Sequence, residues 1–295
     1  MTKARDLADL GGVTTRLEQV GNTDGALSNR SLIINGGMTV SQRGDYTTAT
    51  AVTNNHYSVD RWKDWSSSVT TTHQNTSVTI DGKTYKALRV SATSSSSTAN
   101  IGARQYVEGI NLIPNETYTV HCYMRTNNSN ARLRTYDMLS SGPSQTATIP
   151  ADEQWHKVEV TVDYTSTINP QVGAIIYGNE VTVPISSGDY IEYTLFQLEA
   201  GDTATPFENR SYGDELARCQ RYYQKGFSIY NEDGSNGFVS MLPVEMRASP
   251  SATRTASAIS SGESTPSQVT PNNKRIYIYS GSLPTGGIYD LDAEL

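Results

Sequence analysis

Residues Phe196–Phe227 read FQLEAGDTATPFENRSYGDELARCQRYYQKGF, and this stretch decides the fold prediction. It begins as a strand, breaks at Gly201 and Pro206, and continues as a short helix rich in Arg, Gln and Tyr over Gly213–Lys225. Pro interrupts regular elements and Gly favours turns, so the change from strand to helix marks a boundary. We therefore predict a β-rich region before this stretch and a second region after it.

The chain between Leu32 and Glu199 reads as short strands separated by turn signals. Thr117–Arg125 has side chains that alternate between two faces, and Trp155–Tyr164 alternates as a half-buried strand does. Asp81-Gly82 is a strong hairpin signal. The other expected strands are Leu32–Val40, Ser77–Ile80, Thr84–Val90, Arg132–Leu139, Val172–Tyr177 and Asp189–Leu198. Eight or more antiparallel strands joined by polar turns predict a two-sheet β-sandwich.

A smaller β region is expected after the helix, with strands at Gly237–Met246, Ser251–Ile259 and Arg275–Ser280. The predicted domain organisation follows from these boundaries. Residues 31–208 form the β-sandwich, and residues 209–295 form a linking helix and a small C-terminal β domain.

Residues 1–30 differ in pattern from the rest of the chain. Leu7, Leu10 and Leu17 lie on one face at heptad-like spacing, although Gly11-Gly12 interrupts the pattern. One or two helices of this length are not stable alone. We therefore predict a short N-terminal helical segment for attachment and oligomerisation, which packs against sister chains or another protein. A frayed terminus is the alternative.

The composition favours all-β structure and argues against several function classes. The 295 residues include 18 Tyr and many Thr and Val, which suit a pleated surface. The net charge is −7 without a basic run, so nucleic-acid binding is not expected. The two cysteines, Cys122 and Cys219, are too few for a disulfide framework or a zinc site. No segment is apolar over the length of a membrane span, so membrane insertion is not expected.

Three motifs together resemble bacteriophage tail-fibre and receptor-binding proteins. They are INGGMTVSQRG at Ile34–Gly44, YSVDRW at Tyr57–Trp62, and the stretch Phe196–Phe227. The resemblance covers roughly Leu32–Phe227, and VEMRASPSAT at Val244–Thr253 extends it weakly. It implies a virion attachment protein whose sandwich is a jelly roll like that of carbohydrate-binding modules.

No pattern in the sequence predicts catalysis, a metal site or a cofactor. The four histidines, His56, His73, His121 and His156, show no HxH or HExxH spacing. No phosphate loop, GxSxG elbow or GxGxxG follows a predicted strand. Acidic residues are numerous enough that some pair would meet the separation of glycosidase carboxylates by chance. We therefore expect no catalytic residue, no metal and no cofactor, and predict that the chain is not an enzyme.

Aromatic residues are the better candidates for ligand binding. Trp62 and Trp65 cannot face the same side of one strand, because strand side chains alternate. Trp62 lies within a tail-fibre-like motif and is expected in the core, which leaves Trp65 as a surface platform for a sugar ring. Tyr277, Tyr279 and Tyr289 are further candidates among polar turns. For each Tyr, a structural role at a sheet edge or interface is the alternative.

The favoured hypothesis is a phage virion tail-fibre protein that binds host-surface glycans without cleaving them. It would be a homotrimer, assemble in the host cytoplasm, and join other tail proteins through its N-terminal segment. The alternative is a structural virion adaptor or head fibre that binds virion proteins. A polysaccharide depolymerase would usually be a longer parallel β-helix with repeats, which this sequence lacks. A cellular carbohydrate-binding module would normally carry a secretion signal or a catalytic partner domain.

Overall fold

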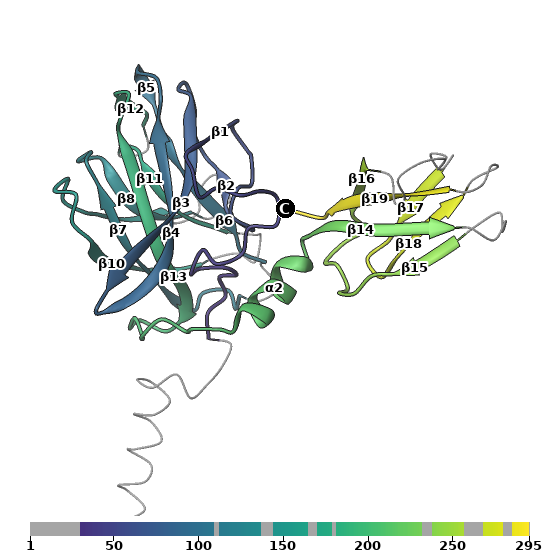
Figure 1. Ribbon diagram of the computed structural model, residues 1–295. Coiled ribbons are helices and arrows are strands. Elements are labelled where there is room, and N and C mark those ends of the chain that lie inside the picture. The colour runs from purple at the N-terminus through teal and green to yellow at the C-terminus, as the bar shows by residue number, and fades with distance from the viewer. Residues whose placement is uncertain are drawn as a thin grey trace, which may run out of the picture.

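The computed structural model of the chain describes residues 30–108, 112–136, 144–164, 170–178, 181–231, 238–256, 268–279 and 285–294. Most of the regular structure in these ranges is β-strand, and the described helix is α2 at Tyr212–Gln220. The predicted helical segment with Leu7, Leu10 and Leu17 lies outside the described residues. The position of the linking helix between two β regions agrees with the sequence (Figure 1).

Thirteen strands precede α2 in the described ranges. They are β1 (Thr50–Val52), β2 (Lys63–Asp64), β3 (Thr71–Ile80), β4 (Lys83–Ala92), β5 (Ser96–Ala99), β6 (Ile101–Tyr106), β7 (Thr117–Thr126), β8 (Ala131–Tyr136), β9 (Ser144–Thr148), β10 (His156–Asp163), β11 (Gln171–Ile176), β12 (Val183–Ile185) and β13 (Tyr190–Ala200). Six of them form a sheet in the order β1-β3-β4-β13-β7-β10, and five form a second sheet in the order β2-β6-β11-β8-β9. The strands β12 and β5 pair separately.

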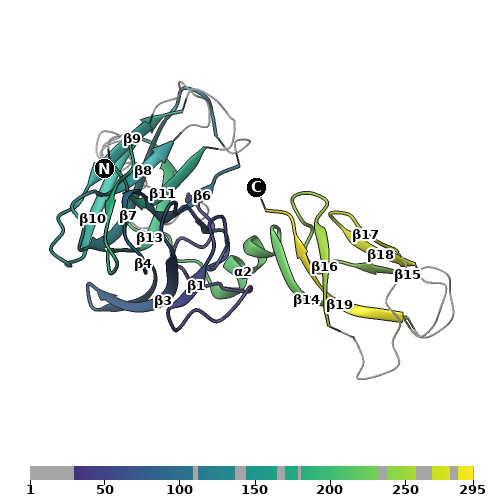
Figure 2. The same cartoon turned by 90° about the horizontal axis from the view of Figure 1, so that it is seen from above.

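The two large sheets pack face to face as a jelly-roll β-sandwich (Figures 1 and 2). The hydrophobic core between them is centred on Trp62, whose ring lies 5.2 Å from that of Tyr193 and 4.9 Å from that of Phe196. Val120 and Met124 of β7 are fully buried and belong to this core. The all-β jelly-roll prediction is therefore confirmed.

Asn35 connects chain segments that are far apart in the sequence. Its side-chain amide donates to the carbonyl oxygens of Val40 (2.8 Å) and Asp60 (2.9 Å). Its Oδ1 accepts from the amides of Thr39 (2.9 Å) and Val40 (3.0 Å), and its carbonyl oxygen accepts from Trp62 Nε1 (3.0 Å). Asn35 is fully buried and has φ of 59°, which Asn adopts more readily than most residues. We call this feature the Asn35 turn.

Gly36 completes the Asn35 turn by lying directly against β13. The amide of Phe196 donates to the Gly36 carbonyl oxygen at 3.0 Å, and a Cβ at Gly36 would lie 2.0 Å from the Phe196 carbonyl oxygen. Only glycine fits this approach. The predicted strand Leu32–Val40 is wrong, because this segment turns at Asn35 and crosses the sandwich as irregular chain.

The helix α2 ends earlier than predicted. Ser211 caps its N-terminus by accepting from the Asp214 amide at 3.2 Å. The prediction of a helix over Gly213–Lys225 is wrong at its C-terminal end. There Tyr222 is 1% exposed beneath the Arg61 guanidinium, which lies 3.5 Å from the ring centroid, and the next residue begins a strand. Tertiary packing thus overrides local helix propensity.

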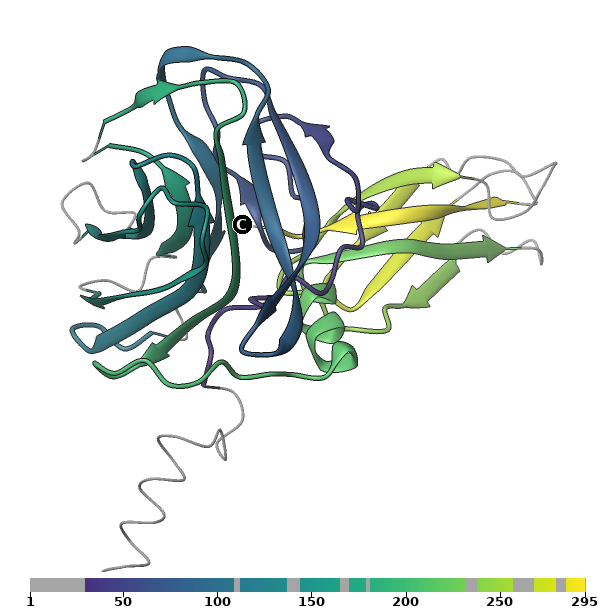
Figure 3. The ribbon, with the colours of Figure 1, turned by 60° about the vertical axis from the view of Figure 1, so that its left-hand side comes forward.

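The strands after α2 form two three-stranded antiparallel sheets. They are β14 (Tyr223–Asn231), β15 (Phe238–Met241), β16 (Ser251–Ala256), β17 (Gln268–Pro271), β18 (Arg275–Tyr279) and β19 (Thr285–Asp292). The sheet orders are β14-β19-β16 and β15-β18-β17. They lie to one side of the sandwich (Figure 3). The sequence missed β14, β17 and β19, and it made the strand at Gly237–Met246 too long.

A buried ion pair joins the chain after β19 to the sandwich. Arg61 and Glu294 are paired, and their side chains are 1% and 6% exposed. Arg61 also donates to the Tyr106 carbonyl oxygen at 2.7 Å. Beside this pair, the Arg43 guanidinium contacts Asp292 at 3.1 Å. Burial alone would lower the pKa of Arg61, but Glu294 raises it overall, so the cation is held by its partner.

Glu199 fixes the segment that follows β13. Its carboxylate accepts from the Thr205 amide at 2.8 Å, the Thr205 hydroxyl at 2.6 Å and Gln197 Nε2 at 3.0 Å. Burial alone would raise the pKa of Glu199, but the nearby His121 imidazole and these hydrogen bonds lower it to about 2. Gln197, Glu199 and Thr205, which lie in the first part of the stretch Phe196–Phe227, thus belong to one hydrogen-bonded turn.

We predict that Glu294→Gln lowers the free energy of unfolding by about 3 kcal/mol, because Arg61 then stays buried without its counter-charge. Urea denaturation measures this change. The matched control is Glu245→Gln, whose pair with Lys274 is exposed (57% and 62%). The control should change stability by less than about 0.5 kcal/mol. Equal losses in both variants would contradict the buried pairing.

We predict that Glu199 makes the protein sensitive to acid. Its folded pKa lies below the ordinary value of 4.5, so its contribution to stability is complete above that pH and is lost as the pH falls toward about 2. In urea titrations across this range, Glu199→Gln should reduce the acid-dependent loss of stability. Glu116→Gln, at an exposed carboxylate, should behave like the unaltered protein. A pH profile unchanged by Glu199→Gln would refute the assignment.

Candidate functional site

Trp65 lies on the outer face of the five-stranded sheet. It follows β2 directly, and its amide donates to the Gly102 carbonyl oxygen of β6 at 2.8 Å. Trp62 is fully buried and Trp65 is half-buried, which confirms the predicted division between core and surface.

Two arginines flank the Trp65 ring. The guanidinium carbons of Arg104 and Arg134 lie 4.6 Å and 5.2 Å from its centroid. The strand register explains this arrangement, because Lys63 pairs with Arg104, Arg104 with Gly173, and Gly173 with Arg134. These residues share one face, and the glycine separates the arginines without adding bulk. Cation–π contacts of this kind orient both the ring and the charges.

Tyrosines border the same row of residues. The Lys63 ammonium lies 5.7 Å from the Tyr57 ring and 5.5 Å from the Tyr106 ring. The Arg134 guanidinium lies 5.1 Å from the Tyr177 ring. We define the Trp65 surface as Tyr57, Lys63, Trp65, Arg104, Tyr106, Arg134 and Tyr177. Rings with apolar faces and polar edges, interleaved with donors, suit a hydroxylated ligand that also has apolar faces.

Of the tyrosines predicted in the C-terminal region, Tyr277 and Tyr289 do not join this surface. Tyr277 is 36% exposed on β18, which lies apart from β2 (Figure 1). Tyr289 is 2% exposed and packs in a hydrophobic cluster with Met246 and Leu291. A ligand-binding role for Tyr289 does not fit this burial. The side chain of Tyr279 lies outside the described residues.

The outer face of the six-stranded sheet also carries a half-buried aromatic side chain, but the charged groups around it are paired with each other. Trp155 is half-buried, with the Arg125 guanidinium 5.1 Å from its ring. Arg125 Nε donates to the buried Glu192 at 2.7 Å, and Arg89 lies 4.0 Å from the same carboxylate. Trp155 packs at the edge of a small hydrophobic cluster on this outer face.

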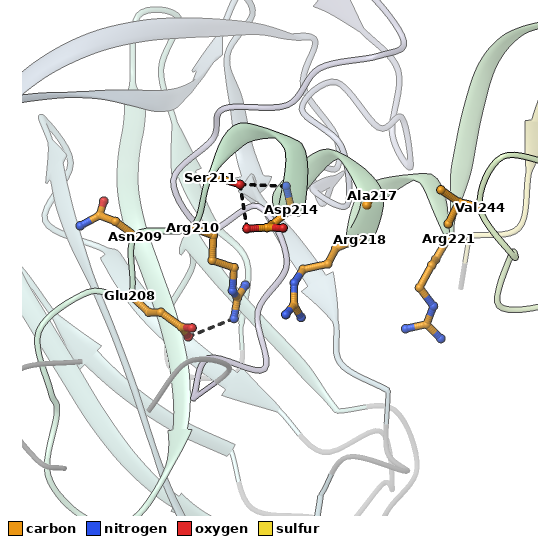
Figure 4. Close-up of a pocket in the computed structure, with 9 residues that line it drawn as sticks. All are labelled: Glu208, Asn209, Arg210, Ser211, Asp214, Ala217, Arg218, Arg221 and Val244. Carbon is orange, nitrogen blue, oxygen red and sulfur yellow. Dashed lines mark hydrogen bonds and ion pairs between the residues drawn. The ribbon is translucent and has the colours of Figure 1, made fainter. Parts of the chain in front are cut away.

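A hollow of about 650 Å³ runs along α2. Figure 4 shows its lining, in which Arg210, Arg218 and Arg221 extend toward the same side. Acidic groups neutralise much of this charge. Arg210 contacts Glu208 at 3.1 Å and Arg221 contacts Glu108 at 3.8 Å. The hollow is therefore a weaker candidate than the Trp65 surface.

A Ser–His–Asp chain that the sequence did not reveal lies inside the sandwich. The Ser58 hydroxyl lies 2.5 Å from His73 Nδ1, and Asp64 lies 2.8 Å from His73 Nε2. All three residues are fully buried, so a substrate cannot reach the hydroxyl. The ring nitrogens are also reversed relative to a catalytic triad, in which Ser contacts Nε2 and Asp contacts Nδ1. The chain satisfies buried polar groups in the core.

Among the described residues, no group of three or more His, Cys, Asp and Glu side chains could hold a metal ion. Within the same ranges, no helix has the length and apolar character needed to cross a membrane. Cys122 and Cys219 are both buried free thiols, as expected. Burial raises the pKa of each thiol, so neither is an activated nucleophile.

Searches against protein-family models and curated proteins gave no match. The chain is similar to solved structures at low identity. A carbohydrate-binding module in complex with β-1,4-galactotriose shares 14% identity, with 59% of this chain and 100% of that chain covered and a TM-score of 0.35. A xylan-binding domain from Paenibacillus barcinonensis shares 10% identity, with 55% of this chain and 99% of that chain covered and a TM-score of 0.33. The enzymatically active domain of tailspike protein 4 from bacteriophage CBA120 shares 13% identity, with 58% of this chain and 22% of that chain covered and a TM-score of 0.39.

We predict that Trp62→Ala and Trp65→Ala differ sharply in stability. Trp62 fills the core and donates to the Asn35 carbonyl oxygen, so its removal should cost about 3–5 kcal/mol. Trp65 is half-buried and contacts mainly long side chains, so its removal should cost about 1 kcal/mol. Thermal and urea unfolding of both variants test this. Unfolding of Trp65→Ala at ambient temperature would place Trp65 in the core.

Proposed function

We propose that this chain is a non-enzymatic component of a bacteriophage tail that binds host-surface glycans through the Trp65 surface. The supporting observation is the half-buried indole on an outer sheet face, flanked by Arg104 and Arg134 at 4.6 Å and 5.2 Å. A flat ring with guanidinium donors fixed beside it matches a sugar, which offers an apolar face and peripheral oxygens. The place in a phage tail rests on the three sequence motifs.

Binding at one such open surface should be weak, about millimolar, which corresponds to roughly −4 kcal/mol. In the proposed homotrimer, three surfaces would act together on a repetitive polymer. Avidity would then raise the apparent affinity by about 10² or more. The proposed attachment through residues 1–30 would hold the trimer in the tail, with assembly in the host cytoplasm.

We predict that Trp65→Ala abolishes binding to an array of bacterial surface polysaccharides while the protein stays folded. The signal should fall at least about tenfold, because the central ring of the platform is lost. Trp155→Ala is the matched control, since it removes an equally large half-buried ring from the opposite sheet. Loss of binding in the control alone would move the site to the six-stranded sheet.

Two further outcomes would overturn the proposal. Release of reducing sugar ends from an array polysaccharide would show an enzyme. No binding to any polysaccharide by the unaltered protein, together with stable binding to other virion proteins, would favour a structural adaptor or head fibre.

A further inference from the structure

The outer face of the five-stranded sheet carries charge of one sign. The inner face is identified by core residues such as Ala103 and Leu133, and the alternate residues point outward. Along β2, β6, β11, β8 and β9, every charged residue on the outward face is a cation. These cations are Lys63, Arg104, Arg132 and Arg134. The whole chain has a net charge of −7, so this face differs in sign from the average surface.

Two of these cations have no acidic partner in the described part of the chain. Arg104 Nη1 donates to the neutral Gln171 Oε1 at 2.7 Å, and its Nε is buried without a hydrogen-bond partner there. Within the same ranges, the Lys63 ammonium contacts the rings of Tyr57 and Tyr106 and forms no ion pair with a carboxylate. A buried donor without an acceptor costs free energy. An acceptor group on a bound ligand would remove this cost at Arg104.

The carboxylates that act electrostatically on Arg104 and Lys63 are already engaged. Asp64, which acts on Arg104, is buried and contacts His73 Nε2 at 2.8 Å. The charges of Asp292 and Glu294 raise the pKa of Lys63, but these carboxylates are paired with Arg43 and Arg61. Burial and the neighbouring Arg104 lower the pKa of Lys63. Burial also lowers the pKa of Arg104, and Arg134 adds to this effect. A bound anion would relieve both the lost solvation and the repulsion among these cations.

We propose that the Trp65 surface binds an acidic polysaccharide, with Arg104 and Lys63 contacting its carboxylate or other anionic groups while a sugar ring lies on Trp65. This inference rests on the proposed function and names the ligand class. Arginine suits the role because its planar donors match a carboxylate and its charge is weakly hydrated.

The dimensions of the surface favour a sparsely charged polymer over a nucleic acid. Lys63, Arg104 and Arg134 lie on three strands with β11 between the arginines, so the row spans roughly 14 Å at the usual strand spacing. Nucleic acids bind through many phosphates neutralised together, which needs a longer basic stripe. A glycan with an acidic group on only some residues matches a short row of cations interrupted by aromatic rings.

Isothermal titration with matched ligand pairs tests the ligand class. The probes are polygalacturonate, hyaluronan and polysialic acid, each beside its carboxyl-reduced form, with double-stranded DNA as a further probe. The unaltered protein should bind at least one acidic polymer about tenfold more tightly than its reduced form, and added salt should weaken that binding. Arg104→Gln and Lys63→Gln should each remove most of the preference, whereas Arg104→Lys should retain part of it.

The control for charge is Lys83→Gln, an exposed cation at the start of β4 in the six-stranded sheet, which should leave binding unchanged. Thermal unfolding verifies that each variant is folded. If the unaltered protein bound acidic and reduced polymers equally, and Trp65→Ala bound neither, the assignment of an acidic ligand would be overturned. The proposed function would then stand. No binding of any polymer in either form would overturn both. Tighter binding to DNA than to every polysaccharide would also overturn the acidic-glycan assignment.

Discussion

The buried Asn35 turn is the constraint on which the rest of the structure depends. It hydrogen-bonds the Val40 and Asp60 backbone and accepts from Trp62, while Gly36 lies against Phe196 with no space for a side chain. The aromatic centre of the sandwich is thereby fixed at the point where β13 continues toward α2. The motifs INGG, VDRW and FQLE are thus far apart in sequence but form one junction, and their residue types are explained by packing.

Much of the fold could be predicted from the sequence because strand alternation and the Asp81-Gly82 turn are local signals. The inward faces of β7 and β10 and the hairpin between β3 and β4 follow directly from them. The errors arose where distant contacts decide the conformation. Leu32–Val40 has strand-like residues but bends at Asn35, and Tyr222 leaves the helix because Arg61 stacks on it.

The candidate site was only partly predictable for the same reason. Alternation separated Trp65 from Trp62, but nothing local indicated that Arg104 and Arg134 would flank the indole. These residues come from three strands separated by up to about seventy positions, and only the register across Gly173 brings them together. The net negative charge of the chain gave no indication of a basic surface, because a net charge averages over all faces of a molecule. The burial of Tyr289 also required the structure, because β19 had not been predicted.

The most direct test of the account is the position of a bound sugar on the folded chain. A crystal structure of the protein with an oligosaccharide of a polymer that it binds would give this position. The account predicts a sugar ring stacked on Trp65, with an acidic group within hydrogen-bond distance of Arg104 or Lys63. A sugar bound instead beside Trp155 on the six-stranded sheet, or beside Tyr277 on β18, with the Trp65 surface empty, would contradict it.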